Sequence, residues 1–204
     1  MVEPLSEDQA DALQEVTNVA MGRAARSLST LLDTFVTLAV PRVQVVDAAN
    51  AAEAVQETAH LPGTVTAVRQ AFFHGLRGEA LTLFAPGGGH NVADLLGLDA
   101  DDADQPPEDE ILIETSNILV GAILSGLGEQ LDTQFSYTPP SVFAKNTPMD
   151  RVLDPGDLEW TTALLVEVTF TLESRNFVCH VLVLLAEDSI AVIRQALDRL
   201  LEDL

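Results

Sequence analysis

Two short polar motifs carry the chemistry that this sequence suggests. The first consists of Asp11, Glu15 and Asn18. The second, 99 residues further along, consists of Glu110, Glu114 and Asn117. Residues three and four positions apart lie on one face of an α-helix. The sequence therefore predicts two helices, each of which presents carboxylates and one carboxamide on a single face.

A carboxamide can orient a water molecule for attack, because it both donates and accepts hydrogen bonds. The glutamine of small GTPases has this role in phosphoryl transfer. Asparagine has a short side chain, so a helix must carry it to its target. A single Glu-x-x-Asn motif is normally only a solvated helix face, but a proline follows each asparagine after 23 residues, at Pro41 and Pro140. This register favours a duplicated site, in which the two prolines have structural roles.

The first motif lies in the pattern of one long helix, from about residue 6 to 33. Ser6 and Gln9 have the types and spacing of a capping box. Apolar residues recur at spacings of three and four: Leu13, Val16, Ala20, Ala24, Leu28 and Leu31. At about 100° per residue, Asn18 points roughly 200° away from Val16. We therefore expect the apolar residues to face a core and the motif to face outward.

The pattern restarts near residue 110, where a second apolar series follows: Leu112, Thr115, Leu119, Ile123 and Leu127. Strands are predicted at 36–40, 42–47, 64–73 and 79–84 in the first half, and at 134–138, 142–145, 160–172 and 177–185 in the second. Residues 90–98 and 189–204 are predicted to be helical, whereas 48–59 fits either a short helix or a loose connection. The later elements align at an offset near 101, which indicates a small insertion in one half.

These elements predict a single domain over residues 1–204, built as a fused pseudo-dimer. Repeat one spans about 6–98, an acidic linker about 99–109, and repeat two about 110–204. The expected fold class is α+β, in which two pseudo-symmetric helix–strand–helix repeats form antiparallel sheets that long helices cover. The two polar faces would then be related by a pseudo-two-fold axis.

Composition limits the partners and the compartment. The formal charge of −22 argues against nucleic acid and anionic membranes as ligands. An uninterrupted run of about 18 apolar residues and the apolar core of a signal peptide are both missing, so we expect a cytoplasmic protein without membrane insertion. The acidity fits either a salt-rich cytoplasm or ordinary acidity with an arginine-biased composition. Cys179 is the only cysteine and lies in an apolar run, which is typical of a buried thiol.

Other residues that can do chemistry lack the spacing that they would need. The four histidines do not have metal-ligand spacing, and Gly87 to Gly89 precede no Lys-Ser/Thr pair. We therefore expect neither a metal site nor a cofactor. Gly22 and Gly121 follow the two asparagines by four residues, and they would permit either close packing within the chain or the close approach of a partner.

The duplicated motif, together with its prolines and with the glycine four residues after each asparagine, resembles the signature of the CheC/CheX/FliY family of chemotaxis phosphatases. Two copies in about 200 residues resemble the CheC type. The resemblance implies dephosphorylation of an aspartyl-phosphorylated response regulator of the CheY type. It implies that Asn18 and Asn117 position the attacking water, and that Glu15 and Glu114 dock a regulator lysine. The Mg²⁺ is expected in the regulator.

Asp11 and Glu110 are expected to make only peripheral docking contacts. Glu110 departs from the family pattern, which has Asp or Ser there, and it also fits a first-turn charge near the helix N-terminus. The alternative function is a non-catalytic adaptor that binds the regulator, or the receptor deamidase CheD, which the resemblance brings in as a possible partner.

Overall fold

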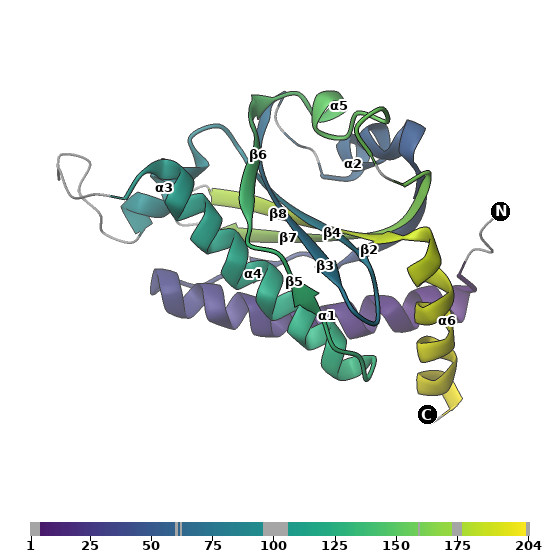
Figure 1. Cartoon of the computed structure of the whole chain (residues 1–204). Helices are drawn as coiled ribbons and strands as arrows, with labels where there is room; N and C mark the ends of the chain where they lie inside the picture. Colours follow the sequence, from purple (N-terminus) through teal and green to yellow (C-terminus); the bar gives the residue numbers. More distant parts are fainter. Residues whose placement is uncertain are drawn as a thin grey trace.

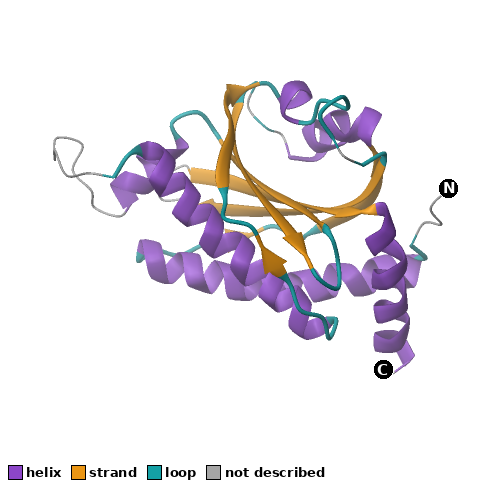
Figure 2. Ribbon diagram, in the orientation of Figure 1, coloured by secondary structure: helices purple, strands orange, loops and turns teal. Residues whose placement is uncertain are grey.

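One curled antiparallel sheet organises the chain, and the longest helices cover one of its faces (Figures 1 and 2). The computed structural model describes residues 5–59, 61, 63–95, 106–158, 160–172 and 177–202. The strands are β1 (Thr37–Leu38), β2 (Arg42–Asp47), β3 (Val65–Phe73), β4 (Gly78–Phe84), β5 (Ser136–Tyr137), β6 (Ser141–Thr147), β7 (Thr162–Leu172) and β8 (Phe177–Ala186). The predicted α+β class is confirmed.

The helices fall into two groups that lie on opposite faces of the sheet. Two long helices, α1 (Glu7–Leu32) and α4 (Glu108–Gln130), lie side by side below it in Figure 1. The helices α3 (Gly88–Leu95) and α6 (Glu187–Glu202) flank them. On the other face lie the 3-10 helix η1 (Ala48–Asn50), α2 (Ala51–Ala59) and α5 (Met149–Val152).

The two halves of the chain exchange their edge strands. The strand order is β1-β7-β8-β4-β3-β5, and β2 pairs with β7 while β6 pairs with β3. Thus β1 and β2 of the first half pair with the second half, and β5 and β6 make the reciprocal pairing. At the centre, β4 pairs with β8, where Leu81 lies opposite Leu182. Because these two residues are 101 positions apart, the pseudo-two-fold axis passes between them.

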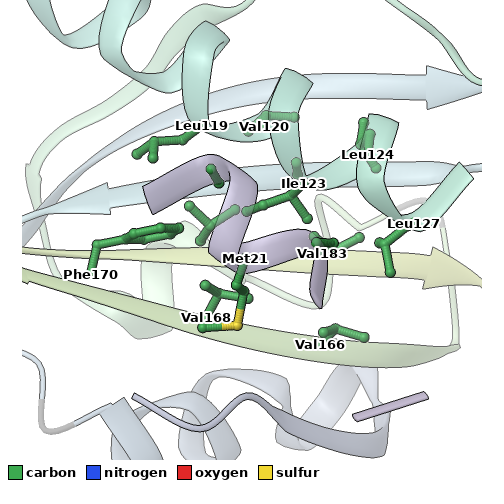
Figure 3. Close-up of a cluster of buried hydrophobic side chains, with 14 of the residues drawn as sticks. Met21, Leu119, Val120, Ile123, Leu124, Leu127, Val166, Val168, Phe170 and Val183 are labelled. Atoms are coloured by element: carbon green, nitrogen blue, oxygen red, sulfur yellow. The ribbon is translucent and has the colours of Figure 1, made fainter. Parts of the chain in front are cut away.

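The side chains of the central strands form two cores, one on each face of the sheet, because successive side chains along a strand point to opposite faces. Figure 3 shows the larger one, where Met21 of α1 and Ile123 of α4 meet Val168 and Val183 of the sheet. On the opposite face, Leu182 belongs to a smaller cluster with α2 and α5. The sheet thus holds α1 and α4 in place through their apolar sides.

Local signals define the ends of α1. The backbone N–H of Gln9 donates to Ser6 Oγ at 3.2 Å, and the N–H of Ser6 donates to Gln9 Oε1 at 3.0 Å, which confirms the capping box. Asp33 ends the helix in the left-handed region at φ 45°. The matching Asp132, 99 residues later, has φ 48° just after α4. Both helices therefore turn into their edge strands in the same way.

The helix α4 differs from its prediction at its N-terminus. It begins at Glu108, so the last two residues of the predicted linker are helical, with three acidic residues in the first turn. Residues 99–105 of that linker, and 96–98 of the predicted helix before it, lie outside the described residues. The short helix α5 was not predicted. Four residues are too few to show a helical period, and Pro148 before it is equally common in turns.

By length and composition, α4 qualifies as a membrane span. Most of its apolar stretch, however, is buried inside the fold, against α1 and the sheet. The core helix of a soluble protein meets the same criterion, so the packing gives no support for insertion in a membrane.

Candidate functional site: two polar helix faces

The first polar face runs along the outer side of α1. Asp11, Glu15, Asn18 and Gly22 are all exposed. The opposite side of the helix is buried from Leu13 to Leu28, as the periodicity predicts. The side chain of Leu31, the last member of the predicted apolar series, lies outside the described residues.

The second polar face lies on α4. Glu110, Glu114 and Asn117 are exposed, and Gly121 is half-buried. All five members of the predicted apolar series, from Leu112 to Leu127, are buried. The structure therefore places every predicted site residue on the solvent side of its helix. It keeps the two motifs on separate helices instead of bringing them into one pocket.

The carboxylates and carboxamides of both faces have no hydrogen bond or ion pair within the described part of the chain. These are the side chains of Asp11, Glu15, Asn18, Glu110, Glu114 and Asn117. Polar neighbours on the same helices are paired: Gln9 Nε2 donates to Asp198 at 2.6 Å, and Asp109 accepts from Lys145 Nζ at 2.7 Å. The motif residues therefore remain available to a partner.

Buried hydroxyl groups fix the turns that carry the asparagines. Thr17, just before Asn18, donates to the Leu13 carbonyl at 2.7 Å within α1. Ser116, just before Asn117, meets the Thr82 hydroxyl of β4 at 2.7 Å. In the second repeat, therefore, a side-chain hydrogen bond ties the motif directly to the centre of the sheet. Sequence patterns alone did not reveal this pair, because its partners lie 34 residues apart.

The two long helices touch closely beside the first motif. A β-carbon added to Gly126 of α4 would lie 2.6 Å from the Ala20 β-carbon of α1, so only glycine fits there without a shift. Beside this contact, Arg23 of α1 pairs with Glu129 of α4. These two contacts join α1 to α4, and no local sequence pattern marks either of them.

Packing within the described chain does not explain Gly22 and Gly121. A β-carbon added to either one would meet nothing within 4 Å. Internal close packing, one of the two alternatives for these positions, is therefore excluded among the described residues. The two motif prolines have structural positions: Pro41 lies between β1 and β2, and Pro140 between β5 and β6.

The remaining groups that can do chemistry lie away from the faces. Cys179 is fully buried on β8, and burial raises the pKa of its thiol, which keeps it protonated and unreactive. His180 lies 3.6 Å from Glu167 and accepts or donates a hydrogen bond with Thr169 on the opposite side of the sheet. Among the described residues, groups of three or more potential metal ligands are not found.

Comparisons with known proteins point to one group. The model of the CheC-like family matches residues 9–45, which include the first motif and its proline. The flagellar motor switch phosphatase FliY of Bacillus subtilis is 27% identical over 179 residues, which cover 84% of this chain. The chain spans only 44% of the length of that relative.

Solved structures share the fold at low identity. FliY of Thermotoga maritima superposes with a TM-score of 0.69 at 19% identity, over 96% of this chain and 98% of that one. The FliM middle domain of H. pylori gives a TM-score of 0.61 at 12% identity, over 94% and 99% of the two chains. The family match at the first motif and the FliY relative thus support the resemblance, and the solved structures show that the fold is shared.

Proposed function

We propose that this chain, a CheC-type protein by its family match and its fold, dephosphorylates an aspartyl-phosphorylated response regulator of the CheY type. The FliY relative supports a place among chemotaxis phosphatases. The regulator as substrate and the roles of individual residues belong to the proposal. So does a cytoplasmic location, where such a regulator would meet the protein.

One observation carries the proposal. Asn18 and Asn117 occupy the same exposed position on two long helices, and neither side chain has a partner within the described chain. Asparagine is a weak helix former, so its repeated use inside a helix at these positions does not serve helix stability. An exposed carboxamide on a rigid helix can enter a shallow site on another protein. There it can hold a water in line with the phosphorus atom.

The glutamates supply orientation in this mechanism. Glu15 precedes Asn18 by three residues, and Glu114 precedes Asn117 by three, so each carboxylate lies on the same face as its carboxamide. A cationic side chain beside the phosphoryl group can pair with the glutamate and fix the docked helix. Asp11 and Glu110 lie two turns before the asparagines, where they extend the negative charge of each face toward the N-terminus of its helix.

The chemistry needs no cofactor held by this chain. The regulator would bring Mg²⁺ and the phosphoryl group, and the helix would supply a positioned water. Ordering a nucleophile in this way can lower a barrier by several kcal/mol. A long exposed helix suits this task better than a closed pocket, because the phosphoryl group is attached to a protein.

The test removes both carboxamides. We expect Asn18→Ala/Asn117→Ala to lower the accelerated dephosphorylation at least about tenfold, because the water loses its orienting group. The measurement is the decay of phosphorylated regulator after the phosphodonor is removed. Asn50→Ala, at an exposed residue of η1, is the matched control and should keep full activity. A folded double variant that retains its activity would contradict the mechanism.

A second function, that of a non-catalytic adaptor, is favoured by one observation. The fold is shared with the FliM middle domain as well as with FliY, both at under 20% identity, so the fold alone does not imply turnover. An adaptor would bind the regulator or CheD through the same faces. Binding assays with each purified protein, run beside the decay measurement, separate the two functions, since an adaptor would bind without accelerating decay.

A further inference from the structure

We propose that Gly22 and Gly121 are contact sites for the main chain of the docked regulator. Because these residues lack a side chain, the regulator comes close enough for each asparagine to reach the phosphoryl group. The inference rests on the proposed function, because it names how the same faces receive that partner. It concerns glycines to which the catalytic mechanism gives no role.

At both positions, glycine makes the helix less stable than most other residues would. Gly22 lies inside the 26-residue helix α1, and Gly121 lies inside the 23-residue helix α4. Neither has a positive φ, so neither serves a turn. Glycine weakens a helix interior relative to alanine, because its backbone loses more conformational freedom on folding. A helix gains nothing from glycine at these two positions.

Two other glycines of α4 are required by packing, because a β-carbon there would collide with a neighbour. A β-carbon on Gly126 would collide with Ala20, and one on Gly128 would lie 2.6 Å from the Thr133 carbonyl oxygen. Around Gly22 and Gly121 the same added atom meets no described residue within 4 Å. The described part of the chain therefore gives no internal reason for glycine at either position. An approaching molecule supplies the remaining physical reason.

The placement of the glycines says what approaches. Each follows its asparagine by four residues, so it lies one turn further on the same face, about 6 Å along the helix axis. A methyl group would hold partner carbon atoms about 4 Å away from its own position. Without it, a backbone segment of the partner can rest on the helix itself. Asparagine has a short side chain, so this closer approach adds directly to its reach.

The negative charge of each face indicates a second feature of the surface that the partner presents. Each face carries two carboxylates on the N-terminal side of its asparagine that are unpaired among the described residues, and the four positions of each face include no basic residue. The fitting surface therefore has a cationic group beside the phosphoryl group. On its other side it has a main-chain loop that rests over the glycine.

The test uses alanine, because the two consequences have opposite signs. We expect Gly22→Ala/Gly121→Ala to raise the melting temperature by a few degrees, since both helices gain a better helix former. The same variant should lose about tenfold in kcat/KM for the phosphorylated regulator, since small displacements of a positioning group cost rate. A purely structural role would not lower activity while stability rises.

The matched control is Gly63→Ala, at an exposed glycine where an added β-carbon also meets nothing within 4 Å. It should change neither activity nor regulator binding. Binding is measured separately, with the regulator loaded with Mg²⁺ and beryllium fluoride as a stable phosphoryl mimic. The double glycine variant should bind it about tenfold more weakly than the unmodified chain.

The outcomes separate this inference from the proposed function. If the unmodified chain accelerates decay and the glycine variant equals it in kcat/KM and in binding, the proposed main-chain contact at the glycines is wrong, whereas the phosphatase function is supported. If the unmodified chain binds the mimic without accelerating decay, the proposed phosphatase function is wrong. Weaker binding by the glycine variant would then still support main-chain contact at the glycines. A chain that neither binds nor accelerates decay contradicts both.

Discussion

The outer sides of α1 and α4 match residue for residue at the motif, whereas their inner sides do not. Glu15 and Asn18 reappear as Glu114 and Asn117, all of them exposed. On the inner side, Ala20 corresponds to Leu119 and Met21 to Val120, all of them buried. A helix that only filled a core would show the reverse pattern. The difference indicates that the outer faces repeat for a reason other than packing.

The surroundings of the two faces also differ. Beside the N-terminus of α1 lies α6, with 16 residues, and Gln9 donates to its Asp198. Beside the N-terminus of α4 lies the shorter α3, with 8 residues, where His90 lies 3.6 Å from Glu108. The N-terminal end of the first face therefore lies beside a longer helix than that of the second.

The first test of the comparison uses single asparagine variants, whose effect falls on activity. Because both carboxamides are exposed and unpaired within the described chain, we expect Asn18→Ala and Asn117→Ala each to retain about half of the activity. The measurement is the rate of regulator dephosphorylation at saturating substrate. If one variant loses nearly everything and the other nothing, the two faces are not equivalent, and the flanking helices become the first explanation to test.

The largest expected effect on stability concerns the hydrogen bond that anchors the second motif to the sheet. Ser116→Ala would leave the buried Thr82 hydroxyl without its partner, which should lower the free energy of unfolding by about 1–3 kcal/mol. The matched change in α1 is Thr17→Val. It should cost less than about 1 kcal/mol, because the Thr17 hydroxyl bonds only to a helix carbonyl. Denaturant unfolding of both variants measures the difference.

The double change Ser116→Ala/Thr82→Val sharpens this second prediction. It removes both polar partners, and it should recover part of the loss, since a matched apolar pair leaves no buried polar group unsatisfied. If Ser116→Ala and Thr17→Val destabilise equally, the sheet anchor does not distinguish the two repeats.

The contact between the helices gives the third prediction. Gly126→Ala would force α1 and α4 apart at Ala20, at a cost of about 1–3 kcal/mol that the better helix propensity of alanine partly offsets. A net loss of about 1 kcal/mol in the free energy of unfolding is expected. Ser27 is the counterpart in α1 and is exposed, so Ser27→Ala should stay within about 0.5 kcal/mol. Equal results would contradict the asymmetric contact.

The elements that the sequence predicted best are those with a strong local signal. The capping box and apolar period located α1 to within one residue at each end, and apolar runs with β-branched residues located β3 and β8 at least as well. The duplicated spacing also located the exposed faces. Solvent exposure of a helix position follows from its angle relative to the apolar residues, so no tertiary information was needed.

What the sequence did not predict depends on tertiary contacts. The exchange of edge strands between halves, the Thr82–Ser116 hydrogen bond and the Gly126–Ala20 contact each join residues far apart in the chain. Periodicity describes one element at a time, so it contains no information on which elements meet. The two alternatives for Gly22 and Gly121 remained open for the same reason, until the space around each was known.

The smallest predicted effect concerns the ion pair that bridges the two faces. Arg23 and Glu129 lie on the surface with side chains 47% and 61% exposed, and the counterpart of Arg23 in α4 is Ala122. Because water screens such pairs, Arg23→Ala should lower the free energy of unfolding by less than about 1 kcal/mol. A double-mutant cycle with Glu129→Ala isolates the pair, and its coupling should vanish in about 1 M KCl. A coupling that survives high salt would contradict a water-screened surface pair.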